Sequence, residues 1–165
     1  MAALIRKRWM TVTAVFFVAG LAMTETSSNY EGLQIPPLPD GHREIEGFVV
    51  DDKPTSYYGV ARLTHDAGEV IWLEKLLYRD EEGHPHWEIK SAVVEPKLEK
   101  GHDYFLGTCM QDGVHQREII ALVELEDKEI QTAIKRVSWV DLNRESVVAR
   151  SVAKITCYID GWGHN

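Results

Sequence analysis

Residues 98–125 read LEKGHDYFLGTCMQDGVHQREIIALVEL, and this stretch decides the fold. A short apolar run at residues 104–110 is followed by the turn signal Gln111-Asp112-Gly113. Residues 118–125 are then rich in Ile, Val and Leu, as in a buried strand. Two short apolar segments separated by a turn signal predict neighbouring antiparallel strands.

The same stretch matches an earlier one when the chain is shifted by about 60 residues, an interval typical of an internal repeat. Glycines at fixed intervals usually meet a backbone requirement, so shared glycines indicate a shared backbone. The sequence therefore predicts a tandem duplication, with repeat 1 at residues 38–97 and repeat 2 at residues 98–157. The matched positions of identical type include Gly41 with Gly101, His42 with His102, and Gly47 with Gly107.

Each repeat is expected to contain four strands. In repeat 2 they fall at residues 104–110, 118–125, 137–141 and 147–156, where apolar and β-branched residues cluster or alternate. Repeat 1 has strand patterns at residues 46–50, 57–63 and 87–94, and residues 70–77 are undecided between strand and helix.

One segment of repeat 2 has helical spacing. Ile130, Ala133, Ile134 and Val137 form an apolar stripe, and Asp127 suits a helix N-cap. We therefore expect a mainly β protein, with two tandem four-stranded antiparallel repeats packed as a pseudo-twofold sandwich or barrel and with short helices. An α+β fold is the alternative.

The first 22 residues have the three parts of a signal peptide. A basic cluster at residues 6–8 precedes a charge-free apolar run over residues 9–23, and Gly20 and Ala22 supply the small residues read by an export peptidase. The run is shorter than the about 20 residues of a spanning helix, which favours cleavage over a retained anchor. We expect a signal peptide at residues 1–22, an extended linker at 23–37 and a C-terminal tail at 158–165.

The chain is acidic. It holds 18 Lys and Arg against 26 Asp and Glu, a net charge of −8, and loss of the basic signal peptide leaves the mature part more acidic still. Nucleic acids and anionic membrane surfaces bind basic patches. We therefore expect no nucleic-acid partner and, after cleavage, no membrane span.

The chain has two cysteines, Cys109 and Cys157. In an oxidising compartment an even number favours pairing, whereas a cytoplasmic location favours two buried free thiols. With the signal peptide, this predicts a disulfide in a periplasmic or secreted protein. Anchorage to the inner membrane by an uncleaved signal is the alternative.

The sequence contains no phosphate-binding loop, dinucleotide glycine fingerprint, nucleophile elbow or His-Glu-x-x-His pattern. It therefore predicts no catalytic residue, no metal site and no cofactor. His42 and His102 are equivalent in the predicted repeat and are candidate binding residues on a pseudo-twofold axis, although two imidazoles are too few for a closed zinc site. His84 and His86 lie in an expected hairpin turn.

A third candidate binding residue, Trp162, lies between two glycines in the tail, either docked in a groove or offered to a partner. Together these features predict an exported cell-envelope protein of non-enzymatic type, a binding, inhibitory or assembly module with a protein partner. A small enzyme with a dispersed active site between the two repeats is one alternative, and it predicts a pocket with converging polar groups. A barrel that carries a small apolar ligand is the other.

Overall fold

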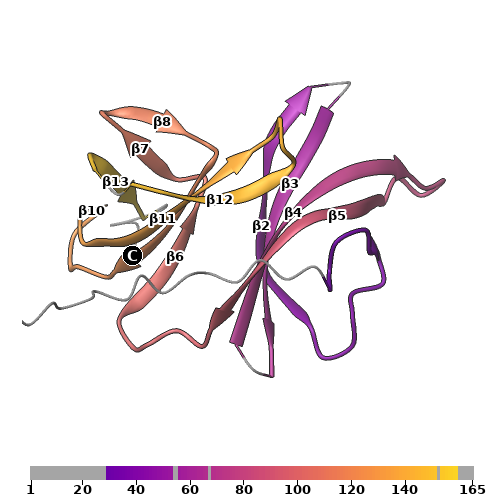
Figure 1. The fold of residues 1–165 in the computed structure, drawn as a ribbon, viewed down its shortest axis with the longest axis horizontal. Helices are drawn as coiled ribbons and strands as arrows, with labels where there is room; N and C mark the ends of the chain where they lie inside the picture. Colours follow the sequence, from indigo (N-terminus) through magenta and orange to yellow (C-terminus); the bar gives the residue numbers. More distant parts are fainter. Residues whose placement is uncertain (1–28, 54–55, 67, 152, 160–165) are drawn as a thin grey trace, which may run out of the picture.

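The computed structural model describes residues 29–53, 56–66, 68–151 and 153–159. In these residues every regular element is a β-strand, and every strand pairing is antiparallel, which confirms the expected mainly β class. A five-stranded sheet lies beside two four-stranded sheets along the long axis of the molecule (Figure 1). The described residues contain no helix with the length and hydrophobicity that crossing a membrane requires.

The first half forms one open sheet with the strand order β1-β5-β4-β3-β2. Side chains alternate between its two faces, so that Val60 and Leu73 enter one core while Ala61 and Trp72 enter another. Its strands are β1 (Gln34–Ile35), β2 (Arg43–Lys53), β3 (Ser56–His65), β4 (Gly68–Arg79) and β5 (Pro85–Pro96).

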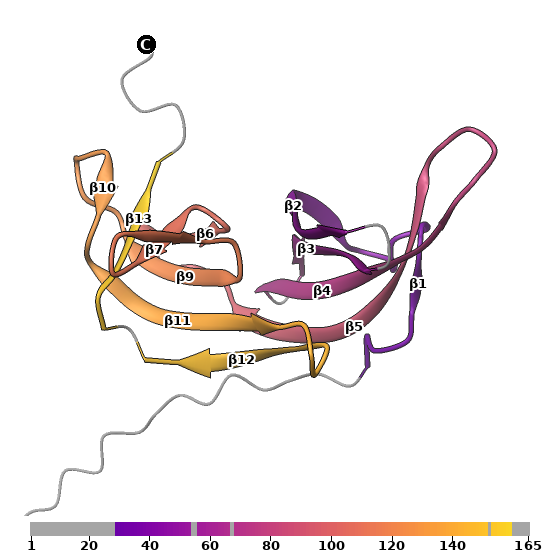
Figure 2. The same cartoon turned by 90° about the horizontal axis from the view of Figure 1, so that it is seen from above.

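The second half forms two smaller sheets, with the orders β12-β11-β9-β6 and β10-β13-β7-β8. The first contains β6 (His102–Leu106), β9 (Ile119–Glu124), β11 (Ile134–Asp141) and β12 (Ser146–Arg150). The second contains β7 (Cys109–Gln111), β8 (Val114–Gln116), β10 (Ile130–Gln131) and β13 (Ile155–Tyr158). Seen from above, the two halves lie side by side (Figure 2).

The two halves share a strand order. In both, four strands follow one another in chain order, as β2-β3-β4-β5 and as β6-β9-β11-β12. Both are preceded by a Gly-His turn, in which Gly41 and Gly101 have φ angles of +75° and +84°. The N–H groups of His42 and His102 each donate to the carbonyl three residues earlier, at 3.1 Å in both.

Strand registers differ between the halves. In the first half Val60 pairs with Leu73, whereas in the second half Ile120, the repeat equivalent of Val60, pairs with Ser138 rather than with Ile134. The order of the strands is therefore alike and their alignment is not. The tandem duplication stays a prediction.

The expected helix near residues 127–137 is wrong. The segment contains β10 and the start of β11. Side chains form hydrogen bonds with its backbone groups: the Gln131 amide bonds three of them. The Glu126 carboxylate accepts from the backbone N–H groups of Thr132 and Ala133. Such side-chain bonds compete with helical ones. Ile130 and Gln131 instead pair with β13.

Three apolar clusters make up the core. The central one draws residues from both halves, including Val60 and Ile71 from the first and Ile120 and Val140 from the second. A second cluster lies between the two sheets of the second half. The third lies on the outer face of the first sheet, where Tyr30, Ile35 and Leu38 cover it. The shared central cluster joins the halves into one unit.

Part of the expected linker at residues 23–37 is docked on the first sheet. β1 pairs with β5, and the Gly32 N–H donates to the Ile89 carbonyl at 2.8 Å. Ile35 is buried. The backbone at these residues is extended, as predicted for a linker, and it is also hydrogen-bonded to the edge of the first sheet.

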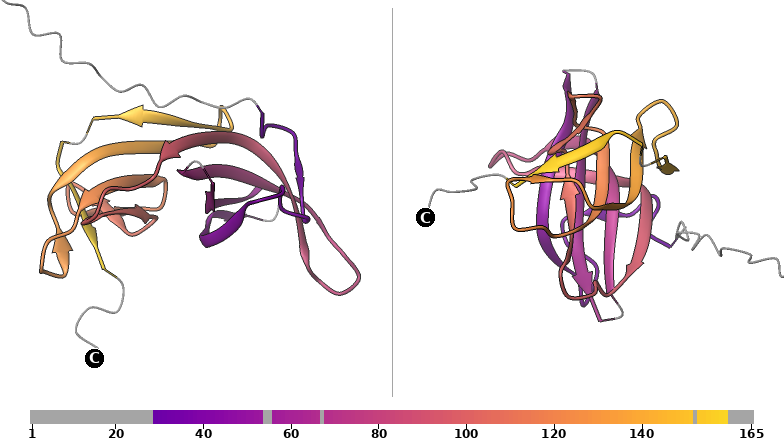
Figure 3. Two further views of the ribbon diagram at one scale, coloured as in Figure 1. Left: turned by 90° about the horizontal axis from the view of Figure 1, so that it is seen from below. Right: turned by 90° about the vertical axis from the view of Figure 1, so that its left-hand side faces the viewer.

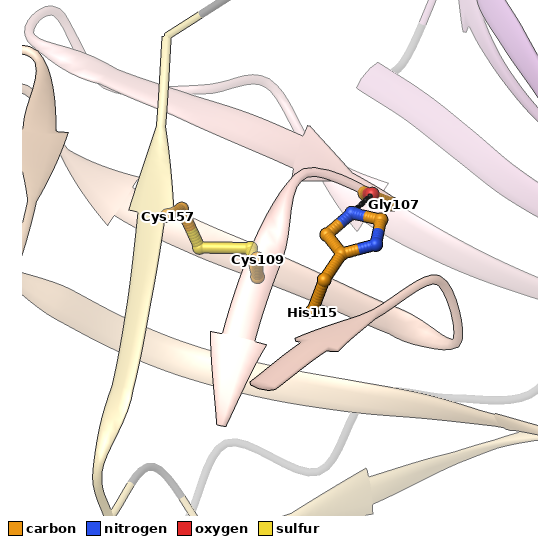
Figure 4. The surroundings of a disulfide bond; sticks show 4 residues. All are labelled: Gly107, Cys109, His115 and Cys157. Atoms are coloured by element: carbon orange, nitrogen blue, oxygen red, sulfur yellow. Dashed lines mark hydrogen bonds between the residues drawn. A yellow bond between two sulfur atoms is a disulfide. The ribbon is translucent and has the colours of Figure 1, made fainter. Parts of the chain in front are cut away.

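The disulfide is confirmed. Cys109 on β7 faces Cys157 on β13 across the strand pair, with a Cα–Cα distance of 4.0 Å (Figure 4). Both cysteines are fully buried. Beside them on β8, His115 approaches the Gly107 carbonyl with its Nε2 at 2.8 Å.

Glu145, in the turn between β11 and β12, ties the second half to the first. Its Oε1 accepts from the Tyr58 hydroxyl at 2.5 Å and from Lys75 Nζ at 2.8 Å, and its Oε2 lies 3.1 Å from Lys90 Nζ. Lys75 and then Tyr58 make the largest contributions that lower the pKa of Glu145, to about 2.

We expect Glu145→Gln to lower the free energy of unfolding at pH 7 by about 1–2 kcal/mol, an amount discounted for the partial exposure of the pair. Because the pKa of Glu145 is depressed in the folded state, this stabilisation is complete above pH 4.5 and fades as the pH falls towards 2. Urea unfolding at several pH values measures it. Glu129→Gln, at an exposed residue, is the control and should change little; equal effects of the two variants would contradict the prediction.

Candidate ligand-binding pocket between the two halves

The connection from β5 to β6 leads from the first half to the second and borders a pocket of about 340 Å³. Its walls come from the end of β5, the connection itself, β6, β9 and β11. The lining residues are Glu95, Pro96, Lys97, Leu98, Glu99, His102, Tyr104, Leu122, Lys135 and Arg136.

Three buried or half-buried polar groups form one side of this pocket. The Arg136 guanidinium is ion-paired with Glu95, whose side chain is only 3% exposed, and Arg136 Nη2 donates to the Tyr104 hydroxyl at 2.7 Å. Burial, and then the Glu95 charge, raise the pKa of Tyr104 well above its usual value. Tyr104 therefore stays protonated at neutral pH and Arg136 stays charged.

A second charge cluster lies behind Tyr104. Arg62, on β3, is 7% exposed and lies 2.8 Å from Glu69, 2.7 Å from Asp103 and 3.0 Å from Glu46. Its guanidinium carbon is 5.3 Å from the centre of the Tyr104 ring. Burial disfavours the charge, but the three carboxylates outweigh it and raise the pKa of Arg62. Because Asp103 belongs to β6, this cluster also fixes the second half against the first.

His102, one of the predicted binding residues, lines the pocket at the start of β6. Its Nδ1 is buried and has no hydrogen-bond partner among the described residues. A buried nitrogen is normally satisfied, so His102 Nδ1 is an exception beside the pocket, and its burial keeps it from direct contact with a ligand in this arrangement.

His42 lies in a different environment. Its Nε2 is 3.0 Å from the Tyr30 hydroxyl, and its ring stacks on those of His65 and Trp72. The structure places His42 on the cluster of the first sheet that contains Trp72 and His102 in the pocket at the β5–β6 connection, so the two imidazoles have different surroundings. Trp162, the third predicted binding residue, lies outside the described residues.

Sequence reasoning missed the buried charges. Arg62, Glu74 and Glu95 each lie in an apolar run and are at most 8% exposed. A charged residue flanked by strand-forming apolar residues was the available signal. Glu74 borders a further pocket of about 300 Å³ in the first half, together with Glu44 and Trp87.

No protein-family model, no curated protein and no solved structure matches this chain. The fold and the pocket define a small antiparallel β protein with one internal disulfide and a charged pocket where its two halves meet. The disulfide is compatible with an oxidising, extracytoplasmic location. We therefore infer the function from the chemistry of the chain's own residues.

Proposed function

We propose that this protein is an exported, non-enzymatic binding module of the cell envelope, periplasmic or secreted, and that the pocket at its β5–β6 connection receives a carboxylate-bearing segment of a partner protein. The signal-peptide pattern and the disulfide support the compartment. The arrangement of positive groups in the pocket supports the ligand class.

Three cationic residues in a pocket of an acidic protein carry the proposal, and they outnumber the two carboxylates, Glu95 and Glu99, that line the same pocket. Arg136 is held in place by Glu95 and Tyr104, and Lys97 and Lys135 line the same pocket. Lys97 has an exposed side chain, and Lys135 is half exposed, so both can approach a ligand. Arginine and lysine side chains that converge on a pocket suit a carboxylate.

Apolar groups complete the fit. Leu98, Leu122 and Pro96 line the pocket beside the charged residues. A pocket of about 340 Å³ lies at the lower end of the volumes that small ligands occupy. It has the size for a terminal residue or a single long side chain of a partner, with an apolar stem and an anionic end.

The buried groups favour binding over catalysis. General acid–base catalysis works best with a group whose pKa is near the operating pH. The pKa values of Tyr104 and Arg136 are both raised, away from neutrality. These two residues therefore stay protonated at neutral pH and serve as fixed donors to a ligand, not as an acid or a base.

The test uses short peptides with an apolar last residue, carrying either a free or an amidated C-terminus, titrated into the exported protein and followed by amide NMR shifts. We expect shifts at residues of the pocket and binding about tenfold weaker for the amidated peptide. The double variant Lys97→Glu/Lys135→Glu should bind the peptide with the free C-terminus about tenfold or more weakly than the wild type does.

Lys128→Glu is the matched control. Lys128 is 43% exposed and ion-paired with Glu126, much as Lys135 is 46% exposed and ion-paired with Glu124, but Lys128 is not part of the pocket. Equal loss in both variants, or shifts confined to other surfaces, would contradict the proposed site. Chemical turnover of a bound peptide would favour the enzyme instead.

A further inference from the structure

The tip of the β4–β5 hairpin holds an acidic and histidine-rich turn that the pocket does not involve. The hairpin extends beyond the rest of the first sheet (Figures 2 and 3). The turn is closed by hydrogen bonds between Asp80 N–H and the His84 carbonyl, and between Gly83 N–H and the Asp80 carbonyl, both at 3.0 Å. Gly83 has a φ of +87°, which glycine adopts without strain.

Asp80 is fixed by this turn in a way that leaves one oxygen for other groups. Its Oδ1 accepts from the backbone N–H of His84 at 2.7 Å. Its Oδ2 lies 3.3 Å from Nδ1 of His84 and 3.5 Å from Nε2 of His86. Two imidazole nitrogens thus converge on a single carboxylate oxygen.

Other side chains near Asp80 offer further ligand atoms. Asp80, Glu82 and His84 offer ligand atoms that all lie within 4.8 Å of one another, and His86 approaches the group from the side of Asp80. The His86 ring stacks on Tyr78 with their centres 4.4 Å apart, which orients it. The His84 side chain is 71% exposed, so it has room to adjust.

The separations at Asp80 are those of a hydrogen bond and an ion pair, and they are also close to the spacing of neighbouring ligands around a metal ion. Zinc bonds of about 2.0–2.1 Å in a tetrahedral site place neighbouring ligand atoms about 3.3 Å apart. The two nitrogen–oxygen distances at Asp80 are 3.3 and 3.5 Å.

We infer that this hairpin binds a divalent transition-metal ion of the zinc type through the carboxylates of Asp80 and Glu82 and the imidazole of His84. His86, whose Nε2 lies 3.5 Å from Asp80 but which is not within 4.8 Å of all three, completes the site when its ring turns toward the ion. Imidazole and carboxylate together suit Zn²⁺, Cu²⁺ and Ni²⁺, whereas Mg²⁺ and Ca²⁺ prefer oxygen ligands alone. The adjacent Glu81 adds negative charge to the turn. The site is distinct from the pocket and does not depend on the function proposed for it.

The test is a titration of the full exported protein with Zn²⁺, in competition with a chromophoric chelator, and with Co²⁺, whose visible spectrum reports the coordination geometry. We expect one equivalent of metal to bind the wild type and His84→Gln with His86→Gln to bind it at least about tenfold more weakly. These variants keep the turn, because Asp80 bonds the backbone of residue 84.

His115→Gln is the control, since His115 is an exposed histidine on β8, in the hairpin that β7 and β8 form. It should bind Zn²⁺ as the wild type does. The inference is overturned if the wild type binds no Zn²⁺ at micromolar concentrations, or if the double variant retains the wild-type affinity and the Co²⁺ spectrum. Asp80→Asn, which keeps an acceptor for the turn, should weaken binding as well.

Discussion

Replacing both cysteines, in Cys109→Ala with Cys157→Ala, should lower the free energy of unfolding by about 4 kcal/mol and the melting temperature by about 10 °C. The cross-link joins residues 48 apart in sequence, so it restricts a long loop of the unfolded chain. In the folded protein β13 has only short pairings, three residue pairs with β7 and two with β10. Much of its attachment therefore depends on the disulfide.

Reduction separates the loss of the cross-link from the loss of side-chain volume. Both cysteines are fully buried in the second-half cluster, so the alanine variant also leaves a small void. Urea unfolding of the reduced wild type should show most of the 4 kcal/mol loss, while the variant should not respond to reductant. If reduction costs the wild type less than about 1 kcal/mol, the strand pairings alone hold this end of the molecule.

Strand content was readable because side chains alternate between two buried faces. Along β9, Ile119, Ala121 and Val123 enter the second-half cluster, while Ile120 enters the shared one. A strand buried on both faces appears in sequence as a continuous apolar run, and residues 118–125 have that pattern. The cysteine pairing was predicted from their even number together with the signal-peptide pattern of the first 22 residues.

The helical spacing of residues 130–137 predicted the wrong element because such spacing is a local signal. Ile130, which the stripe places inside, is 47% exposed, and the polar Gln131 is fully buried. The conformation of this segment depends on the pairing of β10 with β13. The position of β13 is set in turn by its pairing with β7, where Cys157 faces Cys109. Local spacing carries no information about such distant pairings.

The pocket residues were hidden for a related reason. Arg136 and Glu95 look like surface residues in the sequence, and only the packing of β11 against the end of β5 makes them partners. Their burial depends on how the two halves meet. The hairpin turn is the opposite case, because it is local: the sequence already placed His84 and His86 in one turn. It predicted no metal site there, since the position of Asp80 relative to the two imidazoles depends on the folded turn.

Glu74, in the middle of β4, should make the protein less stable as the pH rises through neutrality. The residue is 8% exposed, and its Oε2 accepts a hydrogen bond from Trp72 Nε1 at 3.1 Å. Its Oε1 is so close to β3 that a Cβ on Gly59 would lie 3.0 Å away. Burial first, and then the Glu44 charge, raise the pKa of Glu74 to about 7, although the Trp72 hydrogen bond opposes them.

The direction follows from proton binding. Between pH 4.5 and 7 the folded state holds a proton on Glu74 that the unfolded state has released. The stability associated with the neutral carboxyl is therefore complete below pH 4.5 and is lost as the pH rises through 7. A difference of this size corresponds to about 3 kcal/mol.

Glu74→Gln fixes the neutral form and keeps an acceptor for Trp72. We expect this variant to be about 2–3 kcal/mol more stable than the wild type at pH 8 and close to it at pH 4.5. Urea unfolding across that range, followed by the fluorescence of the buried Trp72 and its neighbours, measures both. Glu44→Gln is the control, because it removes only the Glu44 charge and leaves Glu74 buried. We expect the stability of this variant to fall at a lower pH than that of the wild type. At pH 8 the variant should be more stable than the wild type by less than about 1 kcal/mol. A Glu74→Gln gain that is the same at pH 4.5 and pH 8 would mean that packing, not the ionisation of Glu74, is what the substitution changes.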